Sequence, residues 1–192
     1  MKYLQIFKNN HVQNLSLAKV GICVILLLGI IGCVTKPDKI KPVTNFEAQK
    51  YVGKWYEVAR LDNSFEKDMT HVYAEYSLNP NGSIKVVNSG VKNPTGKRVY
   101  AKGVAKFVQH NRIGYLKVSF FRPFYSPYIV FQLGDAYEYA YVAGNKKQYL
   151  WLLARTKSVP ESVKQDFVKK AKELGFDTEK LIWVHQQSEE AR

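Results

Sequence analysis

The chain has 192 residues, is 46% hydrophobic and 14% aromatic, and carries a formal net charge of +13 at pH 7. This length is ample for one domain with a single apolar core. The basic charge permits a nucleic acid or an anionic membrane surface as partner. However, the sequence has no zinc-finger spacing and no run of six basic residues, and its scattered lysines also fit a plain solvated surface.

Residues 1–32 have the pattern of a secretory signal peptide. The first 19 residues contain three lysines and no acid, and residues 20–31 carry no charge. Such a run suits the apolar region of a signal but is too short to span a bilayer, which takes about 20 residues. The stretch Ile30-Ile31-Gly32-Cys33 then resembles the lipobox of bacterial lipoproteins. The alternative is a buried cysteine in a helix that is not cleaved.

The lipobox resemblance implies that Cys33 becomes the first residue of the mature chain and carries acyl chains that hold it to a membrane. Each buried CH₂ contributes about 0.8 kcal/mol, and durable attachment takes more than one chain. By resemblance to lipoprotein sorting, Val34 in place of an aspartate favours the outer membrane, with the protein facing the periplasm. Residues 33–44 then form the lipidated start and a tether, and 45–192 form the folded domain.

Removal of the signal leaves a domain without cysteine, because Cys23 lies in the discarded segment. Thiol catalysis and disulfides within the fold are therefore excluded. The mature chain keeps 26 basic and 16 acidic side chains, a net charge of +10. An exported, lipid-anchored chain meets membrane rather than DNA, so we expect no nucleic-acid partner.

The sequence pattern of the mature chain predicts a succession of short strands. Residues 71–78 alternate apolar and polar side chains, the period of a strand with one buried face. Asn-Gly and other turn residues separate the apolar runs. The expected strands are 52–61, 71–78, 83–88, 98–108, 115–121, 128–133, 137–143 and 148–156. Evenly spaced antiparallel strands of this kind favour a sandwich or an up-and-down barrel.

One helix and a final strand follow. Ser158 and Glu161 have capping-box spacing, so the helix is predicted to begin with Ser158 as N-cap. Its apolar stripe is Val163, Phe167, Ala171 and Leu174. Gly175 is expected to end the helix, with Phe176 covering the end. We expect this amphipathic helix to pack outside the sheet, and residues 181–185 to add a short strand at an edge.

Four motifs carry a resemblance to the lipocalin family. Gly53-Lys54-Trp55-Tyr56 matches the family's opening signature G-x-W-Y, and "YLWLLAR", ending at Arg155, matches its third motif. "FFRPFY" at 120–125 and "LIWVHQ" at 181–186 are similar to the bacterial outer-membrane lipoprotein subgroup. The resemblance covers residues 45–186. It implies an all-β, eight-stranded antiparallel up-and-down barrel with one C-terminal helix packed outside.

The sequence departs from the family at its middle motif. That motif often reads T-D-Y, whereas this chain has Asp135-Ala136-Tyr137. This departure weakens any inference about a partner that recognises this loop. It does not affect the prediction of the barrel.

By the same resemblance, Trp55 and Arg155 close one end of the barrel, together with the motif residues Gly53 and Tyr56. A guanidinium over an indole ring contributes about 0.5–2 kcal/mol. The role of this pair is structural, so neither residue is a catalytic candidate.

The other end of a lipocalin barrel is open, and an aromatic segment is expected at its rim. Residues 120–128, "FFRPFYSPY", place five aromatic rings around Arg122. As a lip for an amphiphile, the rings would contact its tail while Arg122 or Lys67 would meet an anionic head. Alternatively, the rings fold under the loop as core.

The candidate ligand-binding residues are drawn from the strands and from this rim. They are Val58, Tyr76, Val86, Phe107, Val118, Phe120, Arg122, Phe124, Phe131 and Tyr139. Alternation alone leaves open which strand face lines the lumen and which faces the helix.

The resemblance implies a carrier that binds a fatty acid or a lysophospholipid and stores or transports it without chemistry, cofactor or metal. Two alternatives remain open. One is an envelope interaction module whose barrel is filled by its own side chains. The other is a lipid-ester hydrolase, although there is no G-x-S-x-G elbow and His71, His110 and His185 are far apart in sequence. Family analogy allows a homodimer, which no sequence feature fixes.

Overall fold

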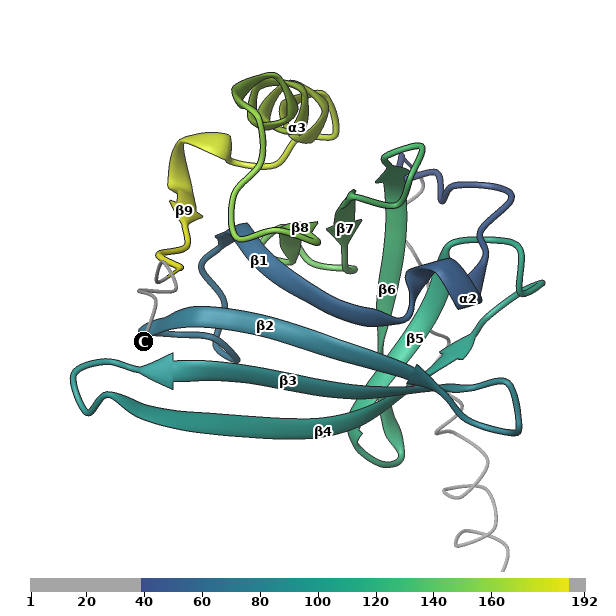
Figure 1. Ribbon diagram of the computed structural model, residues 1–192. Coiled ribbons are helices and arrows are strands. Elements are labelled where there is room, and N and C mark those ends of the chain that lie inside the picture. The colour runs from purple at the N-terminus through teal and green to yellow at the C-terminus, as the bar shows by residue number, and fades with distance from the viewer. Residues whose placement is uncertain (1–38, 187–192) are drawn as a thin grey trace, which may run out of the picture. The chain divides into compact units, whose positions relative to one another are not determined.

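The computed structural model describes residues 39–186 (Figure 1). The predicted signal peptide 1–32 and the predicted acylation site Cys33 lie outside the described residues. Among the residues it does describe, no helix has the length and hydropathy needed to cross a bilayer.

Residues 53–183 contain nine strands in one antiparallel sheet, in the order β2-β3-β4-β5-β6-β7-β8-β1-β9. Their bounds are β1 Gly53–Leu61, β2 Met69–Leu78, β3 Ile84–Lys92, β4 Lys97–Phe107, β5 Tyr115–Phe121, β6 Phe124–Leu133, β7 Tyr139–Ala143, β8 Leu150–Ala154 and β9 Leu181–Trp183. Because β1 pairs with β8 and also with β2, the first eight strands close into a barrel. The predicted eight-stranded up-and-down barrel is confirmed, and β9 is the additional strand at its edge.

Two strand ends differ from the prediction by four residues, the end of β3, at Lys92 in place of 88, and the start of β6. We expected a loop until residue 127, whereas β6 begins at Phe124 and Pro127 pairs with Lys117 of β5. Only Arg122 and Pro123 separate the two strands. The aromatic segment is therefore a tight hairpin that projects beyond the barrel wall.

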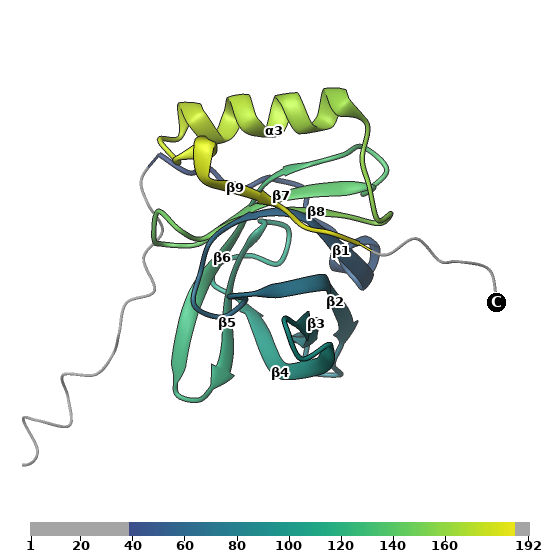
Figure 2. The same ribbon diagram turned by 90° about the vertical axis from the view of Figure 1, so that its left-hand side faces the viewer.

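Helix α3 (Glu161–Glu173) packs across the outside of β1, β7 and β8, as predicted (Figure 2). Phe167 and Ala171 are fully buried and contact Tyr141 and Leu152 in one apolar cluster, and Val163 and Leu174 pack at its margin. The Tyr141 hydroxyl lies 2.9 Å from the Val163 carbonyl oxygen, which fixes the helix against β7.

The predicted start of this helix is wrong, and its predicted end is confirmed. Pro160, with φ −54° and ψ 150°, is the N-cap, and no side chain caps the helix. Proline disfavours a helical conformation in the residue before it, so Val159 cannot begin the helix after a Ser158 cap. At the other end Gly175 has φ +78°, and Phe176 N–H donates to the Ala171 carbonyl, as in a Schellman motif.

The described residues before β1 pack on the barrel. Ile40 is buried in the cluster under α3, and Val43 N–H donates to the Val130 carbonyl at 2.9 Å. The short helix α2 (Ala48–Tyr51), which we did not predict, covers one end of the barrel. Packed structure therefore reaches into the range 33–44 that we assigned to the tether.

The barrel has a seam between β1 and β2 that the C-terminal segment closes. These strands pair only over Gly53–Tyr56 and Tyr73–Tyr76. Beyond that point β9 pairs with β1, and His185 accepts a hydrogen bond from His71 N–H of β2. Gln186 Nε2 lies 2.8 Å from the carbonyl oxygens of both Glu57 and Val72, so it bridges the separated strands.

Candidate functional site

The barrel encloses a cavity of about 270 Å³ lined mainly by apolar side chains of β2 to β6. Three phenylalanines of its lining, Phe65, Phe121 and Phe124, are 62%, 82% and 73% exposed. They belong to the loop 62–68 and to the β5–β6 hairpin, so the cavity opens to solvent at this end.

Five of the ten candidate ligand-binding residues line this cavity: Tyr76, Val86, Val118, Phe120 and Phe124. The exposure of Phe121 and Phe124 agrees with the interpretation of the aromatic segment as the rim of the cavity, because neither side chain is buried in the core.

The other five candidates lie outside the cavity lining. Val58, Phe131 and Tyr139 pack in the cluster beneath α3, on the outer face of the barrel wall. Phe107 packs against Phe46 at the closed end, with ring centroids 5.9 Å apart. Arg122 is exposed beyond the rim, as is Lys67. Both faces of β1, β6 and β7 are apolar where α3 covers them, so Val58, Phe131 and Tyr139 pack beneath the helix and are not part of the cavity lining.

The two residues of the predicted closing pair are in contact, and Trp55 packs against Tyr51 of the cavity lining. Trp55 is fully buried, and the Arg155 guanidinium carbon lies 3.9 Å from its ring centroid. Arg155 donates to the carbonyl oxygens of Lys50 and Lys54 at 2.6 and 2.9 Å. Arg155 therefore ties α2 and β1 to its own position just after β8.

The geometry explains the glycine of the opening signature. Gly53 has φ +97°, a conformation that side chains disfavour, and a Cβ there would lie 3.3 Å from Arg155 Nη1. Trp55 Nε1 donates to the Tyr51 carbonyl at 2.7 Å, which holds α2 over the barrel end. Tyr56, by contrast, is half-buried and stands beside Lys54, whose Nζ is 5.6 Å from its ring.

Three tyrosine hydroxyls meet at the cavity floor. Tyr128 OH lies 2.7 Å from Tyr51 OH and 3.1 Å from Tyr76 OH. Burial raises the pKa of each phenol, so all three keep their protons near neutral pH. Two hydrogen bonds use two of the three O–H donors, which leaves one donor for water or for a polar atom of a ligand.

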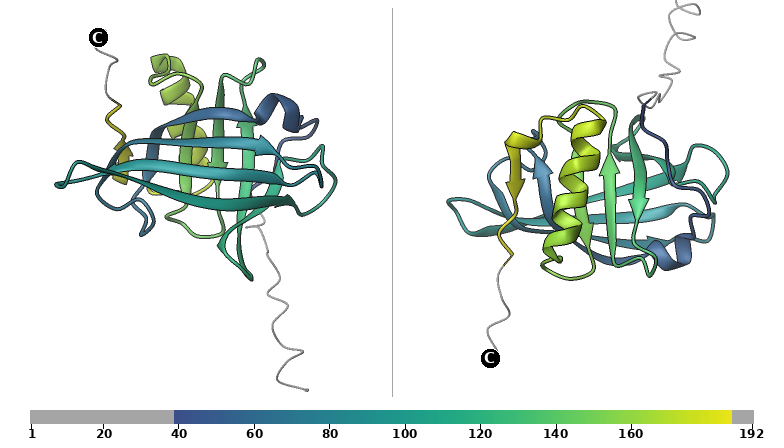
Figure 3. Two further views of the ribbon diagram at one scale, coloured as in Figure 1. Left: turned by 60° about the horizontal axis from the view of Figure 1, so that its bottom comes forward. Right: turned by 90° about the horizontal axis from the view of Figure 1, so that it is seen from above.

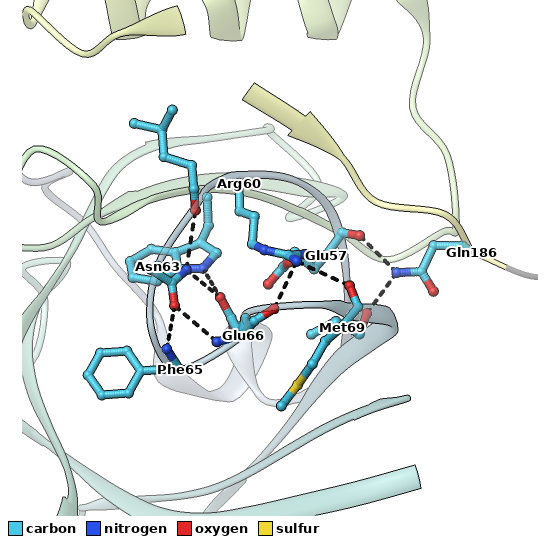
Figure 4. A network of polar contacts seen from close by, with 10 residues as sticks. Glu57, Arg60, Asn63, Phe65, Glu66, Met69 and Gln186 are labelled. Atoms are coloured by element: carbon cyan, nitrogen blue, oxygen red, sulfur yellow. Dashed lines mark hydrogen bonds and ion pairs between the residues drawn. The ribbon is translucent and has the colours of Figure 1, made fainter. Parts of the chain in front are cut away.

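A buried polar network stands beside the mouth (Figure 4). Glu57 and Arg60 are 3% and 2% exposed and form an ion pair at 2.7 Å. A register shift between Glu57 and Ala59 lets both side chains point the same way, three residues apart. Arg60 also donates to the Glu66 and Met69 carbonyls, which holds the loop 62–68 over the barrel.

Glu66 connects this network to the cavity wall. Its carboxylate accepts hydrogen bonds from Asn63 Nδ2 at 2.8 Å and from Trp151 Nε1 at 2.9 Å. Glu57 and Glu66 are the only carboxyl groups in the described lining, and no lysine, arginine or histidine is part of it. We did not predict this network, although charged Glu57 and Arg60 inside an apolar strand were a signal for it.

The buried carboxyl predicts a pH dependence of stability. Burial and then the neighbouring Glu66 charge raise the pKa of Glu57 well above its usual range, against the effect of Arg60. The folded chain therefore keeps this proton where the unfolded chain loses it, so the stabilisation is present at low pH and lost as pH rises through the raised pKa. In denaturant titrations from about pH 5 to about pH 8, we expect Glu57→Gln to flatten the decline in unfolding free energy.

The matched control for this variant is Glu75→Gln, on the outer face of β2. The Glu75 side chain is 52% exposed and lies 3.7 Å from Lys54. This replacement is expected to leave the slope unchanged. A Glu57→Gln chain with the slope of the parent would contradict the assignment.

The structure brings together two histidines that are far apart in sequence. The rings of His71 and His185 meet edge to face at 5.4 Å, outside the cavity lining. His71 Nδ1 lies 3.0 Å from Thr70 Oγ1. Burial lowers the pKa of His71, and the neighbouring charges of His185, Arg98 and Lys157 lower it further. Within residues 39–186, no cluster of three or more His, Cys, Asp or Glu side chains is arranged to hold a metal.

Comparisons with known proteins give consistent results. A model of the lipocalin-like domain family matches residues 46–186. "Outer membrane lipoprotein Blc" of Vibrio cholerae serotype O1 is 49% identical over 157 residues, which cover 81% of this chain and 92% of that protein. The protein of the same name from Escherichia coli strain K12 is 41% identical over 159 residues, with coverages of 82% and 90%.

Solved structures extend the likeness of fold to animal proteins. Insecticyanin of the tobacco hornworm superposes with a TM-score of 0.65 at 23% identity, over 81% of this chain and 87% of that one. Lobster apocrustacyanin A1 gives a TM-score of 0.60 at 16% identity, with coverages of 80% and 94%. At such identities the comparison concerns the fold alone.

Proposed function

Because this chain belongs to the lipocalin family, we propose that it binds a lipid amphiphile, a fatty acid or a lysophospholipid, in the barrel cavity and stores or transports it. The observation that carries the proposal is the apolar cavity, which has the hydroxyls of Tyr51, Tyr76 and Tyr128 at its floor and exposed phenylalanines at its rim. Members of this family are binding proteins, and we expect no chemistry here.

Apolar transfer would drive binding. Each square ångström of tail removed from water contributes roughly 25 cal/mol. A buried head group without partners would cost several kcal/mol, so the head should remain at the mouth.

The charges at the mouth favour a lysophospholipid over a fatty acid. Glu57 and Glu66 are part of the described lining, whereas the two cations that we expected there, Arg122 and Lys67, are not. A fatty-acid carboxylate at this point would be repelled by the carboxylate of Glu66, which lies in the lining. The ammonium group of a zwitterionic head would instead be attracted to the Glu66 carboxylate.

The protein is an outer-membrane lipoprotein, in agreement with the names of its bacterial relatives. We propose the division into a signal peptide at 1–32, acylated Cys33 with a tether, and the barrel. Acylation would place the cavity within reach of the membrane that supplies or receives its ligand.

The test is lipid extraction from natively purified protein, followed by titration of the emptied protein with lysophosphatidylcholine and with palmitate. We expect mass spectrometry to find a co-purified single-chain lipid. Near neutral pH, we expect the lysophospholipid to bind severalfold more tightly, because opposite unit charges about 4 Å apart attract by about 1 kcal/mol even in water, whereas the carboxylate of palmitate is repelled by Glu66. No bound lipid and no saturable uptake of either compound would refute the carrier.

The same titration tests the two alternatives. An interaction module with a filled barrel would take up neither lipid. The 270 Å³ cavity disfavours this hypothesis. A lipid-ester hydrolase would release fatty acid from the lysophospholipid over time. We expect the lysophospholipid to be recovered intact.

A further inference from the structure

One half of the barrel carries basic side chains and no acidic ones. Residues 76–134, which include β3 to β6, contain nine lysines and arginines and no aspartate or glutamate. Strands β3 and β4 lie on the side of the barrel opposite α3 (Figure 3). The acidic side chains of the described C-terminal part gather instead on and around α3, at Glu161, Asp166, Glu173, Asp177 and Glu179.

Four of these lysines share the outer surface of three adjacent strands. Val86, Ala105 and Leu116 line the cavity, so residues an odd number of positions from them along each strand point outward. The outward lysines are Lys85 of β3, Lys102 and Lys106 of β4, and Lys117 of β5, which we call the basic face. The first three are exposed and Lys117 is half-buried.

The basic face is not neutralised within the described chain. Lys106 stands directly opposite Lys117 across β4 and β5, and like charges in that position destabilise a sheet. No described carboxylate forms an ion pair with any of the four lysines. On α3, by contrast, Lys164 pairs with Glu161 and Lys170 with Asp166.

Exposed aromatic side chains adjoin the basic face at the mouth. Phe121, at the end of the strand that carries Lys117, is 82% exposed, and Phe124 across the hairpin is 73% exposed. Arg122 between them is also exposed. Aromatic rings beside basic groups are the combination that partitions into a membrane interface, whereas a soluble polyanion would need no apolar contact.

We propose that the basic face binds an anionic phospholipid surface, with Phe121 and Phe124 inserted at its edge. The barrel then lies on the bilayer with its mouth at the lipid surface and α3 turned away. This contact is separate from the acyl anchor, and it does not depend on which ligand the cavity holds.

Lysine footprinting on vesicles tests the proposal with the full-length protein. The acylated protein is reconstituted into vesicles of phosphatidylcholine, alone or mixed with an equal part of phosphatidylglycerol, and treated with a membrane-impermeant acylating reagent. In the anionic vesicles we expect each basic-face lysine to react about fivefold more slowly, the scale set by about 1 kcal/mol per surface lysine. Lys169 and Lys172 of α3, both exposed, are internal controls and should react at equal rates in both vesicles.

Two double variants test whether the four lysines of the basic face bind the membrane as one surface or are each protected independently. Lys102→Gln with Lys106→Gln should abolish the protection of Lys85 and Lys117, whereas Lys169→Gln with Lys172→Gln should preserve it. Phe124→Ser should weaken protection without a change of charge. At about 1 M salt, where the Debye length falls to about 3 Å, the protection should disappear. Thermal unfolding of each variant checks that the barrel is intact.

Other patterns would overturn the proposal. Equal protection in the two kinds of vesicle would mean that charge does not hold the face. Protection of the α3 lysines instead would mean that the opposite side docks. Protection by a soluble polyphosphate but not by anionic vesicles would identify the partner as another polyanion.

Discussion

Trp55→Ala is expected to lower the free energy of unfolding by about 4 kcal/mol, because removal of a fully buried tryptophan costs about 3–5 kcal/mol. The ring is 0% exposed and lies between Tyr51, with ring centroids 4.8 Å apart, and the Arg155 guanidinium. The loss is a large part of the 5–15 kcal/mol that holds a typical domain together. Denaturant titration measures it, and Trp55→Phe provides a variant that still folds should the alanine variant fail.

Trp183→Ala is the matched control. Trp183 also has a cation over its ring, Lys164 Nζ at 5.5 Å, but it is 46% exposed. Its removal should cost less than about 1 kcal/mol, as for most surface substitutions.

A double-mutant cycle of Trp55→Phe with Arg155→Lys isolates the contact between the two closing residues. Lysine keeps the charge but lacks the planar fork that reaches the Lys50 and Lys54 carbonyls. We expect a coupling energy of about 0.5–2 kcal/mol. Additive effects would show that the two residues stabilise the barrel end independently.

The closing pair was predictable because it is defined by a short motif. Gly53 and Trp55 are two residues apart, and their roles follow from one local conformation and one long-range partner, Arg155. The strand succession was predictable for a similar reason, since alternation and turn residues are local signals. Even so, the helix began at Glu161 rather than after Ser158, because Pro160 constrains the residue before it.

The lumen face was not predictable from alternation. In β7 four of five residues are buried, and in β8 also four of five, because one face meets the barrel interior and the other meets α3. Such a strand is apolar on both sides, so its pattern does not distinguish Tyr139 beneath the helix from a cavity residue. Register shifts occur in β1, β5 and β6. After such a shift, the residues that pointed inward by alternation point outward, so one alternating pattern does not hold along the whole strand.

The polar network at the mouth escaped prediction for a related reason. On a regular strand, two residues three positions apart point to opposite faces of the sheet. The sequence pattern therefore gave no indication that Glu57 and Arg60 are in contact. The register shift between Glu57 and Ala59 restores it. The partner loop and Gln186 come from sequence positions that no local pattern connects with β1.

The side of the barrel away from α3 differs because no helix of the described residues covers its outer face. There only the inner face is apolar, so the outer positions of β3 to β5 are free to carry charge, and they carry lysine. Half of the barrel wall is thus a core between cavity and helix, while the other half is one sheet thick between cavity and solvent. A substitution that points into the cavity from this thin wall changes ligand space without disturbing the helix.

Ala105→Phe in β4 is expected to weaken binding of a single-chain lipid about two-hundredfold. Ala105 is 4% exposed and lines the cavity. Its replacement ring would displace roughly four methylenes of the tail, each worth about 0.8 kcal/mol, and about 1.4 kcal/mol corresponds to tenfold in affinity. Titration with lysophosphatidylcholine measures the change, and the stability should fall little because the ring enters an existing cavity.

Val104→Phe, one residue earlier on the same strand, is the control that separates a filled cavity from a damaged strand. Val104 faces outward between Lys85 and Ser119, so its enlarged side chain leaves the cavity unchanged. If both variants bind the lipid as the parent does, the ligand does not occupy the barrel interior. If both lose binding equally, strand distortion rather than cavity volume controls affinity. Loss in Ala105→Phe alone assigns the bound tail to the space that this wall encloses.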